Sequence, residues 1–278
     1  SSGLYAQTLA EKGFVTLAFD PSWTGESGGQ PRNVASPDVN TEDFSAAVDF
    51  LGVQKEVDRN RIGILGICGW GGMALNAASM DTRIKAVATS VMYDMSRAMG
   101  HGVGDGKDRY SSADRHAVLQ YLNEQRWKDA GNGTFAQGGH DIYVDENGKV
   151  TASERILPEA LPANPNPVLK EFYDYYRMPR GFHARSVNST GAWTATMPLS
   201  FMNMPLLSYA GEIAIPTLIV TGEKAHSRYF AEDAFNAVGS KQKELVIVPG
   251  ANHVDLYDNA AGKIPFAQFE QFFKNSLK

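Results

Sequence analysis

The chain contains a single cysteine, Cys68, in the glycine-rich run Gly66-Ile67-Cys68-Gly69-Trp70-Gly71-Gly72. A nucleophile on a sharp strand-to-helix turn needs small neighbours, because larger side chains would clash with its strained backbone. The positive end of the following helix lowers the pKa of a thiol at such a turn and favours the reactive thiolate. We therefore predict that Cys68 is a nucleophile and that the Gly69 N–H donates to an oxyanion. The alternative is an inert buried cysteine.

The second residue that could do chemistry is His253, which ends the run Val248-Pro249-Gly250-Ala251-Asn252-His253 after an apolar segment. An imidazole near a thiol takes its proton and later returns it to the leaving group. We expect His253 to act as this general base and to lie within hydrogen-bonding reach of Cys68. The alternative is an ordinary loop histidine, since the chain has six.

Together these two runs resemble the nucleophile and histidine segments of α/β hydrolases, and the cysteine version is similar to dienelactone hydrolases and their relatives. The resemblance implies the chain order nucleophile, acid, histidine. It also implies the pattern Gly-x-nucleophile-x-Gly, from which this chain departs because Trp70 stands where the second glycine belongs.

The resemblance further implies an acid in the turn that follows the strand 216–221, at the position of Ala225. Glu223 is the nearest carboxylate in that turn and is our first candidate for the acid. Asp94, just past the segment 84–91, is the alternative, because some members of the fold take their acid from that earlier strand.

Short apolar runs that alternate with amphipathic segments predict a doubly wound, mostly parallel α/β sheet. The expected strands are 14–19, 61–67, 84–91, 216–221 and 244–248, with 61–67 central between 14–19 and 84–91. The expected helices are 4–12, 41–57, 74–80, 112–130, 229–238 and 265–277. The resemblance implies the α/β-hydrolase fold, with N-terminal strands missing from this chain. The second oxyanion donor is then expected upstream of Ser1.

One long stretch, residues 94–212, interrupts this rhythm and is expected to form a lid over the edge of the sheet where Cys68 lies. The core is then expected to consist of residues 1–93 and 213–278. Apolar side chains of the stretch either line a substrate pocket or pack the lid; they include Met178, Phe182, Trp193, Met197 and Phe201. Outside it, Asp20 is expected to brace its own turn through side-chain-to-backbone bonds.

Composition narrows the possible partners. The net charge is −5 and no basic run is present, which argues against nucleic acid and anionic membranes. No apolar run approaches the roughly 20 residues that span a bilayer. The histidines lack metal-ligand spacing, so neither a metal nor a cofactor is expected. The oligomeric state and the compartment are left open, with the cytoplasm favoured.

These features predict a hydrolase that cleaves a carboxylic ester, lactone or thioester of a small molecule through an acyl-thiol on Cys68. One alternative is a lyase or cyclase on the same fold. Another is a catalytically silent binding protein, which the residues Trp70 and Ala225 would favour.

Overall fold

The computed structural model describes residues 1–104 and 106–278, which form two compact units. The first unit consists of Ser1–Phe19, Asn40–Met95 and Leu206–Lys278. The second consists of Asp20–Val39 and Ser96–Pro205 and therefore includes, besides most of the expected insertion, a segment assigned above to the core. The function of the second unit as a lid stays a prediction.

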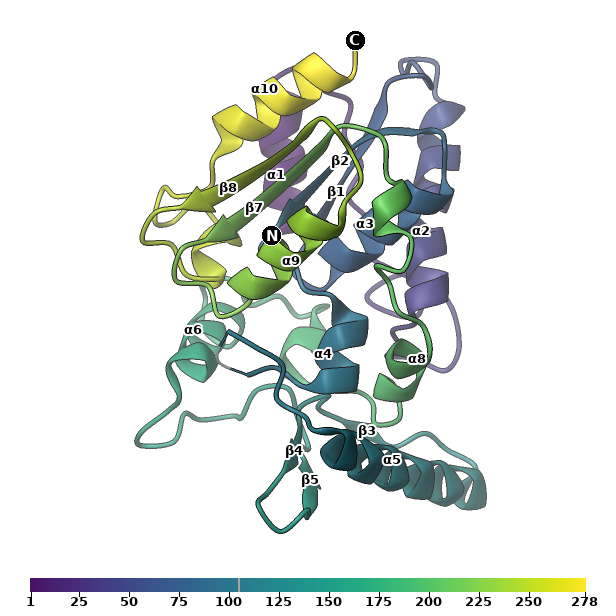
Figure 1. Cartoon of the computed structure of the whole chain (residues 1–278), viewed down its shortest axis with the longest axis vertical. Coiled ribbons are helices and arrows are strands. Elements are labelled where there is room, and N and C mark those ends of the chain that lie inside the picture. The colour runs from purple at the N-terminus through teal and green to yellow at the C-terminus, as the bar shows by residue number, and fades with distance from the viewer. Residues whose placement is uncertain (105) are drawn as a thin grey trace. The chain divides into compact units, whose positions relative to one another are not determined.

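A four-stranded parallel sheet forms the centre of the first unit (Figure 1). Its strands are β1 (Ile62–Ile67), β2 (Ile84–Ser90), β7 (Thr217–Gly222) and β8 (Lys243–Val248), in the order β1-β2-β7-β8. All three pairings are parallel. The central strands β2 and β7 are buried almost throughout, as their continuous apolar sequences predict. Four of the five expected strands are thus confirmed, together with the doubly wound parallel sheet.

Helices pack on both faces of this sheet (Figure 1). On one face α3 (Trp70–Met80) contacts β1 and β2, and α9 (Arg228–Ala237) contacts β7 and β8. On the other face α10 (Phe266–Ser276) contacts β2 and packs against α1 (Ser2–Glu11). The fifth helix, α2 (Pro37–Gly52), begins in the second unit and ends in the first. The expected helices of the first unit are therefore present, with ends shifted by a few residues.

The segment 14–19 is not a strand, and this prediction was wrong. Among the described residues it joins no sheet, so β1 is an edge strand rather than a central one. Its β-branched and aromatic residues favour a strand only where a neighbouring strand accepts the ladder hydrogen bonds. Contacts of its rings hold the segment instead: Phe14 meets Phe273 of α10, and Phe19 meets Phe44 of α2. Val15 remains 58% exposed.

The second unit is built around the long helix α5 (Ser112–Asn132), as the sequence predicts. Its core cluster consists of Val118 and Leu122 of α5 with Ile142. Two short antiparallel pairs complete it, β3 (Gln137–Gly138) with β6 (Trp193–Thr194) and β4 (Ile142–Val144) with β5 (Val150–Ala152). Its other helices are α4 (Met95–His101), which begins in the first unit, α6 (Pro167–Tyr176), α7 (Val187–Thr190) and α8 (Pro198–Asn203).

Local signals explain where these elements begin and end. A capping box between Ser111 and Asp114 starts α5, and Gly133 ends it with a φ of 65°. Asp20 braces its turn as predicted, because its carboxylate accepts a hydrogen bond from the Glu26 N–H at 2.9 Å. Of the apolar residues expected to line a pocket or pack the unit, Phe201 is buried, with 1% of its surface exposed, whereas Phe182 is 54% exposed.

The packing of α10 on β1 leads to a first prediction. A Cβ at Gly63 would lie 2.8 Å from Cε1 of Phe273 and 3.3 Å from the Ala86 carbonyl oxygen. Gly63→Ala should therefore lower the free energy of unfolding by about 1–3 kcal/mol. Gly3→Ala is the matched control, because no atom lies within 4 Å of its Cβ. It should leave stability unchanged or raise it by up to about 1 kcal/mol. Urea unfolding of both variants tests this, and equal effects would contradict it.

Candidate active site

The backbone of Cys68 is held in a left-handed conformation, with a φ of 58°, at the turn between β1 and α3. Such a conformation costs a non-glycine residue about 1–3 kcal/mol. Hydrogen bonds to the end of β2 enforce it. The Cys68 N–H donates to the Ser90 carbonyl at 3.0 Å, and the Cys68 carbonyl accepts from the Tyr93 N–H at 3.0 Å. The thiol is therefore placed at the carboxyl end of the sheet, beside the first turn of α3.

The glycines around this turn are needed for close approach. A Cβ at Gly66 would lie 2.4 Å from the Trp70 carbonyl oxygen, and one at Gly71 would lie 2.4 Å from Cβ of Met92. A glycine is not required at position 70, where the ring of Trp70 packs near that of Phe44, with centroids 6.4 Å apart. The departure at Trp70 is therefore compatible with the turn, because the closest contacts fall one residue later.

His253 lies past the end of β8 and is completely buried. Its Nδ1 is 2.7 Å from the hydroxyl of Ser227, in the turn between β7 and α9. Its Nε2 is 3.0 Å from the hydroxyl of Tyr257. The 3₁₀ turn η2 (Val254–Leu256) begins directly after the histidine and brings Tyr257, four residues later, back to the ring.

Hydrogen bonding from the Tyr257 hydroxyl and the Gly69 N–H lowers the pKa of the Cys68 thiol. Burial raises the pKa of this thiol, and these two hydrogen bonds only partly oppose the effect. The net shift in the pKa of the thiol is therefore upward, opposite to the direction expected from the helix end. Tyr257 thus contributes to the surroundings of both sequence-predicted residues, Cys68 and His253.

The surroundings of His253 keep its imidazole neutral. Three rings enclose it, with centroid distances of 5.1 Å to Tyr93, 5.0 Å to His226 and 5.2 Å to Tyr257. Burial lowers the pKa of His253 well below its ordinary value, and the nearby His226 lowers it further. A neutral imidazole has one unprotonated ring nitrogen, which is what a general base requires.

Glu223, the first candidate for the acid, does not contact His253 in the described structure. Its carboxylate accepts a hydrogen bond from the Gly250 N–H at 2.7 Å and so joins the turns that follow β7 and β8. The Nδ1 side of the imidazole faces Ser227 instead. Glu223 directly follows Gly222 and is exposed, and its carboxylate is bonded to the Gly250 N–H rather than to the imidazole of His253. Asp94, the alternative acid, is half-buried just beyond the end of β2, and its catalytic function stays a prediction.

Sequence reasoning missed three residues that organise this site: Ser227, Tyr257 and Tyr5. The sequence did contain a signal for Tyr257: it is four residues after His253, and residues four apart in a helical turn lie on the same face. Ser227 had one too, since it lies in the turn where the acid was sought. Tyr5 had none: its hydroxyl donates to the Leu256 carbonyl at 2.7 Å and lies 2.8 Å from Oγ of Ser90. It thereby joins residues 251 positions apart.

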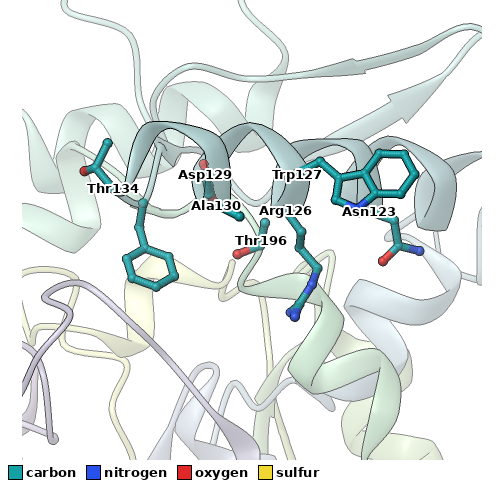
Figure 2. A pocket seen from close by; sticks show the side chains of 9 residues that line it. Asn123, Arg126, Trp127, Asp129, Ala130, Thr134 and Thr196 are labelled. Atoms are coloured by element: carbon teal, nitrogen blue, oxygen red, sulfur yellow. The ribbon is translucent and has the colours of Figure 1, made fainter.

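The second unit contains an open cavity of about 610 Å³ along the C-terminal half of α5 (Figure 2). Its lining includes Arg126, Phe135 and Trp127, the last with 75% of its surface exposed. Asp129 in its wall is already bonded to the Gln125 side chain and the Ala136 N–H. None of its lining residues belongs to the set expected from the sequence.

Within residues 1–104 and 106–278, no group of three His, Cys, Asp or Glu side chains is arranged to hold a metal ion. In the same described ranges, every helix is too short or too polar to cross a bilayer.

No family model matches the chain. The Pseudomonas aeruginosa protein PA2218 is 55% identical over 278 residues, which are 100% of this chain and 69% of PA2218. The chain belongs to the PA2218 family. The Escherichia coli K12 protein YcjY is 34% identical over 269 residues, covering 94% of this chain and 78% of YcjY. A local match to the thiohydrolase aneE of Aspergillus aculeatus has 37% identity over 82 residues, 30% of this chain and 26% of aneE.

Solved structures show the fold of this PA2218-family member. The crystal structure of PA2218 aligns with a TM-score of 0.88 over 100% of this chain and 80% of that chain. The α/β hydrolase GrgF of Penicillium sp. sh18 aligns with a TM-score of 0.71 and 19% identity, over 98% of this chain and 83% of GrgF. The chain therefore has the α/β-hydrolase fold expected from the resemblance.

The burial of His253 leads to a pH-dependence prediction. Its folded pKa lies well below the ordinary value of 6.5, so the unfolded chain binds a proton that the folded chain does not. This contribution to stability is complete above pH 6.5 and falls below it, by at most about 1.4 kcal/mol per pH unit, until the folded pKa is reached.

We expect His253→Gln to reduce the loss of stability between pH 6.5 and 5, because it removes the titrating ring. The matched control is His116→Gln, at an exposed position, which should keep the wild-type slope. Urea unfolding at several pH values measures both slopes. A His253→Gln slope equal to that of the wild type would contradict the burial of a neutral imidazole.

Proposed function

We propose that this protein is a hydrolase that cleaves a carboxylic ester, lactone or thioester of a small molecule through an acyl-enzyme on Cys68, with His253 as the general base. The observation that carries the proposal is the left-handed backbone of Cys68 at the strand-to-helix turn between β1 and α3. Backbone strain of this kind is maintained only where the surrounding structure enforces it, and it is concentrated at functional sites.

In the proposed reaction the sulfur of Cys68 attacks the acyl carbon after its proton has passed to His253. A C–S bond forms and the carbonyl electrons move onto the oxygen, which the Gly69 N–H stabilises as one donor of the oxyanion hole. The bond to the leaving alkoxide or thiolate then breaks, and that group takes the proton from His253. Water, activated by the neutral imidazole, hydrolyses the acyl-thiol and restores the thiol.

The comparisons support acyl chemistry without selecting a substrate. The match to a thiohydrolase covers 30% of the chain and favours thioesters within the proposed class. The hydroxyl of Ser227 at Nδ1 of His253 favours a Cys–His pair supported by hydroxyl groups over the expected triad with Glu223.

Trapping the acyl-enzyme tests the proposal. Purified protein is mixed with activated acyl esters, acyl thioesters of N-acetylcysteamine and lactones, and intact mass is recorded within seconds. Since Cys68 is the only cysteine in the chain, an acyl adduct that is absent from Cys68→Ala identifies it as the nucleophile. His253→Gln should slow acylation by about 10²–10⁴-fold, the usual contribution of a general base. Glu223→Gln should leave the acylation rate nearly unchanged.

Product analysis in ¹⁸O-labelled water separates the alternatives. Hydrolysis places one labelled oxygen in the released carboxylate, because water attacks the acyl-thiol. A cyclase or lyase would release unlabelled product after forming the adduct. A silent binding protein would form no adduct with any member of the panel, and this result would overturn the proposal.

A further inference from the structure

We propose that Ser227 is a positioning residue for His253, and that its hydroxyl holds the imidazole through Nδ1 in the orientation that the proposed reaction needs. This inference rests on the proposed function, since it names the group that orients the general base of that reaction. The acid expected in the same turn, Glu223, is bonded to the Gly250 N–H instead.

The contact between Ser227 and the imidazole is short and enclosed. Oγ of Ser227 lies 2.7 Å from Nδ1 of His253, which is an ordinary hydrogen-bond distance. Both residues have 0% of their surface exposed, so bulk water does not compete for this bond. A general base works only while its ring keeps a fixed position relative to the group that it deprotonates. A hydrogen bond from a buried group to one ring nitrogen supplies such a constraint.

Ser227 also departs from the usual behaviour of a serine at its position. It is the N-cap of α9, where a serine hydroxyl normally accepts a hydrogen bond from an N–H of the first turn. The Ser227 carbonyl does accept from the Phe230 N–H at 3.1 Å, but its side chain makes no capping bond. The hydroxyl is directed to His253 instead. The helix thus forgoes a stabilising contact, which indicates that the side chain of Ser227 serves the site rather than α9.

The turn that carries Ser227 is tied to the nucleophile turn through Tyr93. The Tyr93 N–H donates to the Cys68 carbonyl at 3.0 Å. The Tyr93 hydroxyl is hydrogen-bonded with Nε2 of His226, the residue directly before Ser227. The Tyr93 ring also packs against the imidazole of His253, with centroids 5.1 Å apart. One tyrosine therefore contacts the nucleophile turn, the base and the turn that orients the base.

A serine at Nδ1 orients the ring without placing a charge beside it. A carboxylate at this nitrogen would hold the ring and would also stabilise the imidazolium. A neutral hydroxyl supplies the first effect and little of the second. Burial of His253 already lowers its pKa, so the ring stays in the neutral form that accepts a proton. The contribution of Ser227 is therefore geometric, and its loss should slow proton removal without weakening substrate binding.

The primary test observes the ring of His253 directly and needs no acyl substrate. The full chain is labelled with ¹⁵N-histidine, and the nitrogen resonances of His253 are assigned by comparison with His253→Gln. We expect Ser227→Ala to move the Nδ1 resonance of His253. Ser227→Thr, which keeps the hydroxyl, should leave this resonance near its wild-type position. An unchanged Nδ1 resonance in Ser227→Ala would overturn the proposal.

Ser240→Ala is the matched control, because it removes another buried hydroxyl. Ser240 has 2% of its surface exposed, and its hydroxyl accepts a hydrogen bond from the Gln242 N–H at 3.1 Å. It precedes β8, whereas His253 follows this strand, so the two lie at opposite edges of the parallel sheet. Ser240→Ala should keep the wild-type Nδ1 resonance and acylation rate. An equal effect of both substitutions would refute a specific function of Ser227.

Acylation rates connect the orientation of the ring to the reaction. With an acyl thioester of N-acetylcysteamine, Ser227→Ala should lower the maximal rate of acylation by about tenfold to a hundredfold. The KM should stay nearly unchanged, because Ser227 acts through the imidazole. Ser227→Thr should restore most of the rate; if its added methyl group prevents folding, Ser227→Ala decides the test by itself. A wild-type rate in Ser227→Ala, or a loss confined to KM, would contradict the proposal.

The same measurements distinguish this inference from the proposed function. If the wild type forms acyl-Cys68 and Ser227→Ala acylates as fast, the positioning function is wrong and the hydrolase proposal stands. If the wild type forms no acyl adduct with any substrate while the Nδ1 resonance moves in Ser227→Ala, the hydrolase proposal is wrong and the orienting hydrogen bond stands.

Discussion

The left-handed backbone of Cys68 is the constraint on which the rest of the site depends. A non-glycine residue stays in this conformation only because hydrogen bonds to Ser90 and Tyr93 tie it to the end of the neighbouring strand. The glycines around it follow from the same constraint, since the following helix must approach that strand closely. The parallel sheet brings the histidine turn after β8 to the same edge, because the carboxyl ends of its strands lie together.

Burial determines the charges at this edge. Burial lowers the pKa of His253, which is completely buried, and raises that of Cys68, which is partly buried. Each shift favours the neutral form of its group. Hydroxyl groups are partners compatible with this state, because they satisfy the ring nitrogens without imposing a charge. The hydroxyls of Ser227 and Tyr257 occupy these positions.

The relationship to PA2218 concerns the fold that positions Cys68 and His253. The chain shares 55% identity with PA2218 over 278 residues and aligns with its crystal structure at a TM-score of 0.88, so the two proteins share one fold. The second unit has its own core around α5, which makes it a structural unit in its own right.

The sequence by itself determined four of the parallel strands, the long helix of the second unit, the strand-to-helix turn at Cys68 and the position of His253 after the last strand. These features depend on local patterns: continuous apolar runs, helical periodicity and glycines where a Cβ does not fit. The failure at 14–19 has a physical reason, because a strand requires a hydrogen-bonding neighbour that no local pattern supplies. Only the tertiary structure decided that Glu223 bonds to Gly250, and that Ser227 and Tyr257 contact the imidazole. Which groups meet inside a desolvated site depends on how distant turns pack, and contacts such as that of Tyr5 with Leu256 join residues from opposite ends of the chain.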